Sequence, residues 1–291
     1  MKQFYLIFAL LIFPLSFAQK TERIKLRKFR VAYLSDSLQE TSGLTFLHDK
    51  LYTINDGGNT SEIFEINPKT GGILQKIPVD FPNKDWEAIA TDGKNIFIGE
   101  FGNNAGSRKD LKIYQWDILE NKPEVSRSIA FQYWAQTDFS KQYFNHDYDA
   151  EAMIFLENNI HLFTKNWKSK NVSHYIINLE NREVQHLVAL ESFPTGFVVT
   201  DAAYFENKLY LVGYTRKARV YMMVFENNKG LFFGGNYKKY CLGSALSVGQ
   251  IEGIAVNKNG IYFSNENFRK LIFKSRQSLY FVPFSELNTD K

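Results

Sequence analysis

The chain of 291 residues contains a single cysteine, Cys241. One cysteine cannot form an internal disulfide, so the stability of the fold must come from its core and from the way the chain closes on itself. Histidine is also scarce, and its five copies show no metal-ligand spacing. The sequence has no Gly-x-Ser-x-Gly, phosphate-loop or His-Glu-x-x-His motif. The single cysteine excludes a metal site built from several thiolates. The chain also lacks the common sequence motifs of hydrolases and of nucleotide-binding proteins.

A dominant charge of either sign is missing as well. The formal net charge is +4, and acidic and basic residues are interspersed along the chain. Nucleic-acid-binding domains concentrate Lys and Arg on one face, so we expect no nucleic-acid partner. Beyond the first 13 residues, no apolar run approaches the ~20 residues that a membrane-spanning helix needs, so we expect no membrane insertion.

The first residues have the pattern of a secretory leader. Lys2 precedes an apolar run over residues 4–13, and the small residues Ser16 and Ala18 follow. This order predicts a signal peptide over 1–18 with cleavage after Ala18. We therefore expect a secreted or periplasmic protein whose mature part, residues 19–291, forms one domain.

A short phrase recurs five times, and each copy opens an apolar run that a second apolar run follows within a few residues. Such a period of paired strands is typical of a radial repeat. Aligned on the third position of the phrase, the copies give Ser42, Glu87, Glu151, Asp201 and Glu252.

The repeats predict an all-β fold, a five-bladed β-propeller with four strands per blade. The last blade is one strand short, and residues 28–34 are expected to supply that strand and close the ring, which removes an open sheet edge. A six-bladed ring is the alternative, but it needs a sixth phrase. The expected strands are 43–47, 51–54, 62–67 and 72–79; 88–91, 96–99, 111–116 and 127–133; 152–156, 160–164, 173–179 and 184–191; 202–205, 209–213, 220–225 and 231–237; and 253–256, 261–264 and 279–283.

The aligned acidic residues should meet at one mouth of the central channel, because each inner strand of a propeller starts on the same face. Converging carboxylates need a compensating charge. A hard cation held by oxygen ligands would supply it, and Ca²⁺ fits best in the absence of Cys ligands. We therefore predict a Ca²⁺ site among Glu87, Glu151, Asp201 and Glu252. The alternative is structural: each carboxylate accepts backbone N–H groups of a neighbouring blade and holds the ring together.

The residues that follow the second strand of each blade are unusually polar and should reach the same mouth. Lys165 among them could supply counter-charge. We predict that these residues bind a small ligand: Asp56, Asn59, Glu100, Asn103, Asn104, Lys165, Asn166 and Asn265. Two insertions, around 102–110 and 135–148, lengthen the interval between the second and third phrases. His146, in the second insertion, and Glu151 are the candidate catalytic bases, although the pattern favours a solvated loop histidine over a catalytic one.

These motifs resemble a set found in uncharacterised secreted bacterial propeller proteins. The resemblance is carried by Asn55-Asp56-Gly57-Gly58-Asn59, Asp85-Trp86-Glu87-Ala88-Ile89-Ala90, Gly99-Glu100-Phe101-Gly102-Asn103-Asn104, Asp149-Ala150-Glu151-Ala152 and Ile251-Glu252-Gly253-Ile254. The chain is more loosely similar to esterase-like phytase and gluconolactonase-type propellers, in which carboxylates and Asn hold a central cation. That similarity implies a Ca²⁺-assisted hydrolase of an ester, a lactone or a phosphoester. The alternative function is a non-catalytic binding or scaffold propeller of the cell envelope. We expect a monomer that meets a small molecule or an envelope protein.

Overall fold

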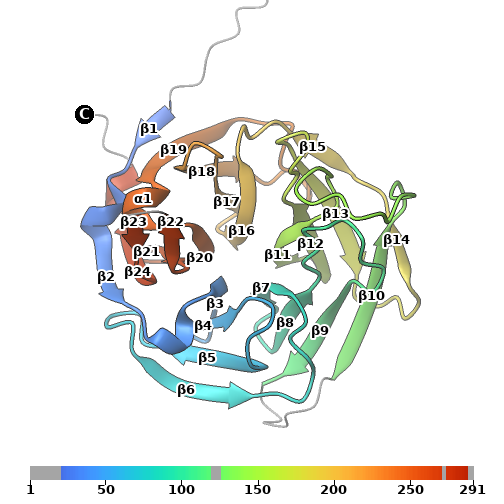
Figure 1. Cartoon of the computed structure of the whole chain (residues 1–291), viewed down its shortest axis with the longest axis horizontal. Helices are drawn as coiled ribbons and strands as arrows, with labels where there is room; N and C mark the ends of the chain where they lie inside the picture. Colours follow the sequence, from blue (N-terminus) through green and yellow to red (C-terminus); the bar gives the residue numbers. More distant parts are fainter. Residues whose placement is uncertain (1–20, 119–125, 271–272, 288–291) are drawn as a thin grey trace, which may run out of the picture.

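Five small sheets surround a central channel in a computed structural model of the chain (Figure 1). The structure describes residues 21–118, 126–270 and 273–287, so the predicted signal peptide lies outside the described residues. The inner strands β3, β7, β11, β16 and β20 contact one another in a closed circle. The chain is therefore a five-bladed β-propeller, as the repeats predict, and the six-bladed alternative does not apply.

Each blade is an antiparallel meander that runs outward from the channel. Its alternating apolar residues form the core between blades, for example Trp86, Phe97 and Phe131, which are fully buried. The blades, inner strand first, are β3 (Thr41–Leu47), β4 (Lys50–Asn55), β5 (Glu62–Ile66) and β6 (Ile73–Pro78); β7 (Trp86–Thr91), β8 (Asn95–Glu100), β9 (Lys112–Asp117) and β10 (Arg127–Tyr133); β11 (Ala150–Leu156), β12 (Asn159–Thr164), β13 (Val172–Asn178) and β15 (Glu191–Phe193); β16 (Val198–Phe205), β17 (Lys208–Tyr214), β18 (Arg219–Glu226) and β19 (Tyr237–Ser244); and β20 (Ile251–Asn257), β21 (Gly260–Asn265), β24 (Ser278–Pro283) and β2 (Arg30–Tyr33).

The N-terminal segment closes the ring, which confirms the predicted role of residues 28–34. Strand β2 pairs antiparallel with β24 of the last blade. A shorter strand, β1 (Thr21–Arg23), pairs parallel with β19 of the fourth blade. A 3₁₀ turn over Leu26–Phe29 joins the two strands and buries Leu26. The N-terminus therefore completes two blades, one more than predicted.

Two of the predicted outer strands are wrong. In the fourth blade the outer strand is β19, Tyr237–Ser244, and not 231–237, because Phe232 leaves the sheet and buries its ring against His174 of the third blade. In the third blade the segment 184–191 splits. Its first part, β14 (Gln185–Leu187), pairs parallel with β10 of the second blade, and the fourth strand begins only at Glu191.

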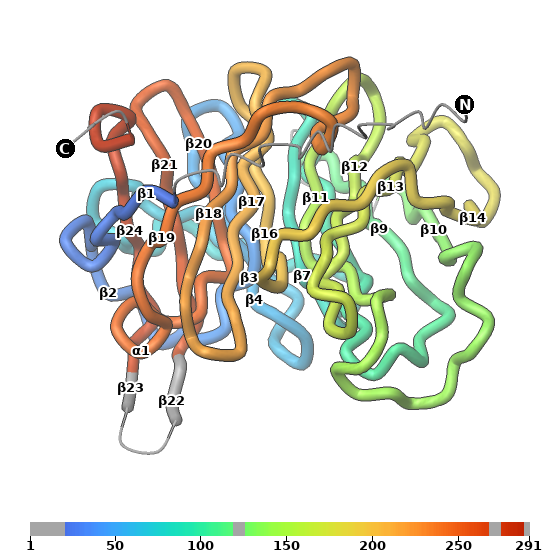
Figure 2. Tube along the Cα trace, turned by 90° about the horizontal axis from the view of Figure 1, so that it is seen from above, coloured from blue at the N-terminus to red at the C-terminus, as the bar shows by residue number. Residues whose placement is uncertain are grey.

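The remaining elements are short. They are α1 (Ala245–Val248), the 3₁₀ turns η2 (Asp36–Leu38) and η3 (Phe284–Leu287), and the paired strands β22 (Phe268–Lys270) and β23 (Phe273–Ser275). The chain segments 101–111 and 134–149 project from the same face of the ring as α1 (Figure 2). Within the described ranges, no helix has the length and apolar character needed to cross a bilayer.

We predict that the closing segment contributes strongly to stability. Leu34 is 2% exposed and packs with Leu279 in the core of the last and first blades. Leu34→Ala should lower the free energy of unfolding by about 2–5 kcal/mol, the usual cost of such a cavity. Leu74→Ala, at a residue that is 59% exposed, is the matched control and should change it by less than about 0.5 kcal/mol. Equal effects of the two variants in urea unfolding would contradict a packed closure.

Candidate metal and ligand site at the channel mouth

Every inner strand carries a β-bulge near its start. The pairing register skips one residue in each of the five strands, and the skipped residues are Gly43, Glu87, Glu151, Thr200 and Glu252. A bulge re-aims a side chain that would otherwise alternate with its neighbours. Three of the five bulges carry Glu, and all three of these side chains line the same cavity.

Asp201 does not share this position, because Thr200 occupies the bulge of its strand. The sequence alignment of Asp201 with the three glutamates is therefore off by one residue. The Asp201 carboxylate is buried and accepts the N–H groups of Ile254 at 2.7 Å, of Ala202 at 2.8 Å and of Leu44 at 3.3 Å. Burial raises its pKa, and these three donors oppose that effect. Asp201 thus joins the first, fourth and fifth blades, as the structural alternative describes.

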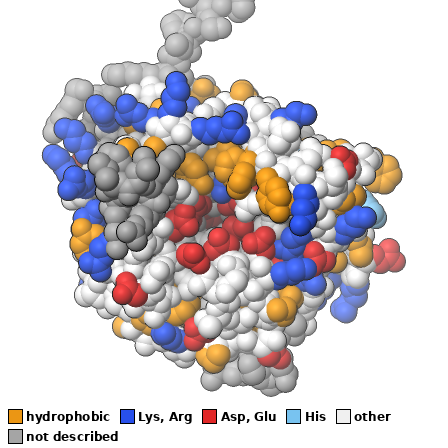
Figure 3. Space-filling model, viewed as in Figure 1, with side chains coloured by type: hydrophobic (Ala, Val, Ile, Leu, Met, Phe, Trp, Pro, Cys, Tyr) orange, Lys and Arg blue, Asp and Glu red, His pale blue; other side chains and the backbone are white. Residues whose placement is uncertain are grey.

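A cavity of about 390 Å³ opens at the channel mouth. Acidic side chains gather in the hollow at the centre of this face (Figure 3). The walls come from all five blades and from both insertions, and most of the lining groups are polar. The lining residues are Glu40, Thr41, Ser42, Asp56, Glu87, Asn104, Phe144, Glu151, Lys165, Trp167, Tyr214, Gln250, Glu252 and Glu266.

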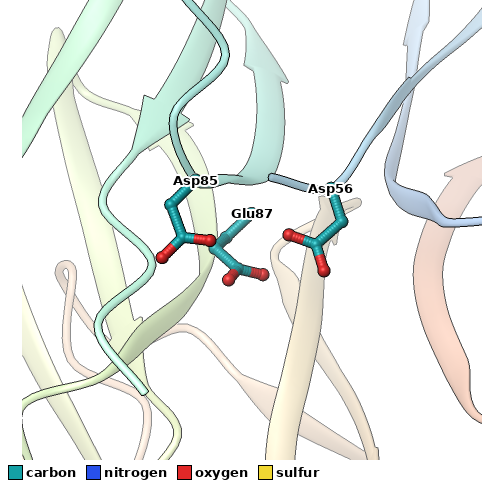
Figure 4. A group of neighbouring side chains, drawn as sticks. All are labelled: Asp56, Asp85 and Glu87. Atoms are coloured by element: carbon teal, nitrogen blue, oxygen red, sulfur yellow. The ribbon is translucent and has the colours of Figure 1, made fainter. Parts of the chain in front are cut away.

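One edge of this cavity holds a group of carboxylates with the spacing of a cation site. One oxygen atom each of Asp56, Asp85 and Glu87 lies within 4.8 Å of the other two. Figure 4 shows the three carboxylates facing one another from the loop after β4 and from the start of β7. A Cβ atom on Gly102 would lie 2.4 Å from Glu87 Oε1, and one on Gly57 would lie 2.5 Å from Asp85 Oδ1. The two glycines therefore leave the room in which the carboxylates converge.

A buried lysine lines the same cavity. Lys165 Nζ lies 2.9 Å from Glu151 Oε2, and both side chains are buried. The ammonium also lies over the rings of Trp167 at 5.0 Å and Tyr214 at 5.6 Å. Burial on its own would lower the pKa of Lys165, but the charges of Glu151 and the other acidic groups outweigh it and raise that pKa well above the usual value. Lys165 therefore carries a positive charge.

One ammonium does not balance the carboxyl groups of the cavity. Burial raises the pKa of Asp56 to about 6 and, together with the charge of Asp56, that of Asp85 to about 6. Burial and the charge of Glu252 raise the pKa of Glu266 to about 8. The pKa of Glu87 is raised well above its usual value, again by burial first and then by Asp56. Without a further cation, several of these groups must hold protons near neutral pH.

The structure brings some of the predicted ligand residues to the cavity and places others in supporting roles. Asp56, Asn104 and Lys165 line it. Glu100 is buried, accepts the N–H groups of Lys84 and Asp85, and forms an ion pair with Arg108 at 2.7 Å. These contacts fix the position of Asp85.

The asparagines predicted as ligands likewise lie in different places, and most of them do not line this cavity. Asn59 donates to Glu40 Oε2 at 2.7 Å, at the rim. Asn103 is tied to Asp149 and Tyr148 and does not line the cavity. Asn265 bonds through its amide N to two backbone carbonyls beside it, and Asn166 lines a second, neighbouring cavity.

His146 is placed next to the cavity but not inside it. Its Nε2 lies 3.1 Å from the carbonyl oxygen of Asn104, and its Nδ1 accepts the N–H of Tyr148 at 3.1 Å. These contacts define the tautomer with the proton on Nε2 and leave no ring nitrogen free for a substrate. The geometry gives His146 the part of a positioning residue for Asn104. Its predicted catalytic role finds no support in these contacts.

Several residues of the site were not identified from the sequence. Asp85 belongs to the carboxylate group, and Tyr214 and Gln250 line the cavity. A signal for Asp85 was present in Asp85-Trp86-Glu87, because side chains two residues apart in an extended chain point to the same side. Tyr214 is the last residue of β17, as Asn55, Glu100 and Asn265 are the last residues of β4, β8 and β21.

Comparisons with known proteins add little beyond this geometry. No family model and no curated protein matches the chain. A chain of the mitotic checkpoint complex superposes with a TM-score of 0.40 at 9% identity, and the match covers 82% of this chain and 63% of that one. A Thermus thermophilus protein named as an oxidoreductase (glucose dehydrogenase) gives 0.48 at 10%, covering 87% and 98%. A Bacteroides uniformis protein named as a 6-phosphogluconolactonase gives 0.40 at 11%, covering 87% and 67%. Likenesses at this level say nothing of the ligand.

A substitution at Asp201 can distinguish a carboxylate that stabilises the fold from one that binds a metal ion. Asp201→Leu leaves the N–H groups of Leu44 and Ile254 without an acceptor, and should lower the free energy of unfolding by on the order of 3 kcal/mol. Asp80→Leu, at an exposed carboxylate, should have little effect. Denaturant unfolding with EGTA present measures both. A stable Asp201→Leu protein that has lost a response to Ca²⁺ would show instead that Asp201 is a ligand.

A second prediction concerns pH in the absence of metal. Between about pH 4 and pH 8 the folded cavity holds protons that the same carboxyl groups release in the unfolded chain, since their folded pKa values are raised. Stability must then fall as the pH rises through this range. In EGTA, the melting temperature should drop by about 5 °C or more from pH 5 to pH 8. Glu266→Gln should flatten the upper part of this curve. A melting temperature that rises or stays constant would contradict the proposed protonation.

Proposed function

We propose that the chain binds Ca²⁺ through Asp56, Asp85 and Glu87, and hydrolyses an ester, lactone or phosphoester bond of a small substrate in the central cavity. The observation that carries the proposal is the convergence of these three carboxylates at one edge of a cavity that also contains the buried Lys165. A supporting argument is the excess of carboxyl groups over cations described above.

The donor set fits a hard divalent cation. Three carboxylates offer up to six oxygen atoms, and Ca²⁺ takes 6–8 oxygen ligands. Gly57 and Gly102 leave space beside these oxygens that a side chain would fill. Arg108 Nη1 lies 3.7 Å from Asp85 Oδ2 and holds that carboxylate in place. When bound, the cation would polarise a carbonyl or phosphoryl oxygen of the substrate.

The other residues of the cavity have proton-transfer and binding roles in this proposal. Glu151 is the carboxylate that would accept a proton from the attacking water, with Lys165 beside it to hold its orientation and to attract an anionic substrate. Glu266, with its pKa raised to about 8, would hold a proton at neutral pH and could donate it to the leaving oxygen. Trp167 and Phe144, whose ring centroids lie 4.7 Å apart, form an apolar wall for the substrate.

A second candidate is a non-catalytic binding or scaffold propeller of the cell envelope. It is favoured by the backbone contacts that occupy both nitrogens of His146 and by the structural contacts of Asp201 and Glu100. In this case the cavity would still bind a small ligand, but no bond would be cleaved. Export from the cytoplasm is part of both proposals and rests on the leader sequence alone.

The first experiment measures Ca²⁺ binding by calorimetry and by the shift of the melting temperature. Ca²⁺ at about 100 times its dissociation constant should raise the stability by about 2.7 kcal/mol. Glu87→Gln and Asp85→Asn should abolish the shift, whereas Asp80→Asn, an exposed carboxylate outside the cavity, should keep it. No binding to the wild-type protein would exclude the metal site.

The hydrolase proposal is tested on the same proteins with p-nitrophenyl acetate, bis-p-nitrophenyl phosphate and δ-valerolactone. We expect Ca²⁺-dependent turnover of one class that falls about 100-fold or more in Glu151→Gln, as is usual for loss of a general base. Ca²⁺ binding without turnover of any of the three would favour the non-catalytic alternative.

A further inference from the structure

A second cavity of about 450 Å³ lies beside the acidic one, on the outer side of His146. One wall is the insertion 135–148, and the other is formed by residues 166–173, which comprise the turn after β12 and the first residues of β13. The two cavities have no lining residue in common, although Asn104 and Lys165 of the first are in contact with or adjacent to His146 and Asn166 of the second. The volume lies within the range of small-molecule pockets, roughly 300–1,000 Å³.

The insertion that forms the outer wall is held by the other insertion, 102–110. Gln136 donates through Nε2 to the carbonyl of Gly106 at 2.7 Å, and Gln142 N donates to the carbonyl of Ala105 at 2.8 Å. Phe144 N donates to the carbonyl of Asn104 at 3.1 Å. A Cβ atom on Gly106 would lie 2.8 Å from the His146 ring, so the two insertions pack closely. The cavity is therefore built into the fold by specific contacts.

Most of the lining groups are uncharged and can form hydrogen bonds, and the charged lining residues are Asp138, Asp147 and the exposed Lys168. Amides and hydroxyls predominate, among them Asn145, Asn166, Asn171, Ser169, Ser173 and Ser192. The two carboxylates already have donors. Asp147 Oδ1 accepts the N–H groups of Lys168 and Ser169, and Asp138 accepts Ser140 N and Gln142 Nε2. Nothing in this arrangement calls for a cationic ligand.

Two features show where a ligand would engage. Asn166 is 2% exposed and donates to Ser173 Oγ at 3.1 Å, but its Oδ1 accepts no hydrogen bond from the part of the chain that the structure describes. A hydroxyl group at the floor of the cavity would supply the missing donor after a small rotation of this amide. Tyr148 and Tyr175 also line the cavity, and Tyr133 packs against both of their rings. The cavity thus combines amides, hydroxyls and fixed aromatic rings.

We propose that this second cavity binds a neutral saccharide of two or three units. Sugar hydroxyls both donate and accept hydrogen bonds, which matches a lining of amides and hydroxyls, and the C–H faces of a pyranose can pack on the tyrosine rings. The two lining carboxylates already accept hydrogen bonds, which disfavours a cationic ligand, and Lys168 lies at an exposed position of the cavity. The proposal is independent of catalysis in the acidic cavity, because it uses none of the residues that line that cavity.

The test uses saturation-transfer NMR and calorimetry on the full mature protein, with maltotriose, cellotriose, mannotriose and chitotriose as probes and EGTA in the buffer. EGTA keeps the proposed metal site empty, so failure of one proposal does not affect the other. We expect one of these neutral probes to bind with a dissociation constant on the order of 1 mM or below. Absence of binding by all four would overturn the proposal.

Asn145→Trp, at an exposed residue of the rim, should fill the opening and weaken binding at least 10-fold. Lys141→Trp is the matched control: it adds the same side chain to an exposed position of the same insertion that does not line the cavity, and binding should be unchanged. Asn171→Leu, which removes an amide from the opposite wall, should also weaken binding. If the saccharide binds all three variants equally well at unchanged melting temperatures, it occupies another site and the assignment is wrong.

Discussion

The structure depends on how the five inner strands find hydrogen-bond partners for the backbone groups on the edge that faces the central channel. Each of these strands pairs with its own blade on one side only, so its other edge must find partners outside the sheet. Side chains provide several of them. Ser42 Oγ donates to the carbonyl of Glu87, Thr200 Oγ1 donates to the carbonyl of Ile251, and Asp201 accepts N–H groups from two other blades. These links join neighbouring blades where apolar packing is least able to do so.

The same constraint prepares the site. The bulge that recurs in each inner strand releases one residue from pairing and turns its side chain toward the mouth, and in three blades that residue is Glu. Polar residues at equivalent ends of the second strands then hold the adjoining loops, as Glu100 holds Lys84 and Asp85. Relative to the bulge, the structural carboxylate of Asp201 is therefore one residue further along its strand than the glutamates that line the cavity. Their roles differ because the side chain of Asp201 reaches the backbone of other blades, whereas the glutamates at the bulges line the cavity.

Much of the fold could be predicted from the sequence, because blade number and closure depend on patterns that repeat. The five phrases, and the missing strand of the last blade, were enough to predict the ring and its closure by residues 28–34. What failed depends on contacts without a local signal. The parallel pairings of β1 and β14 join residues far apart in the chain. Phe232 lies in an apolar run that has the pattern of a strand but packs between blades. At the site, the one-residue offset of Asp201 could not be seen without the bulge, whereas Glu87, Glu151 and Glu252 were placed at the mouth correctly.

The pairing of the N-terminal strands β1 and β2 with the last two blades affects the order in which the fold can form. Thr21–Arg23 and Arg30–Tyr33 are synthesised well before their partners, Lys239–Cys241 and Ser278–Tyr280. Three blades can form their meanders while the N-terminal segment is still without its partners. Contacts between residues so distant in sequence slow folding, because a long loop must close before they form. A chain whose synthesis stops before the last blade can still pair β1 with β19, but it leaves β2 without its partner β24 and therefore open to a protease or a chaperone.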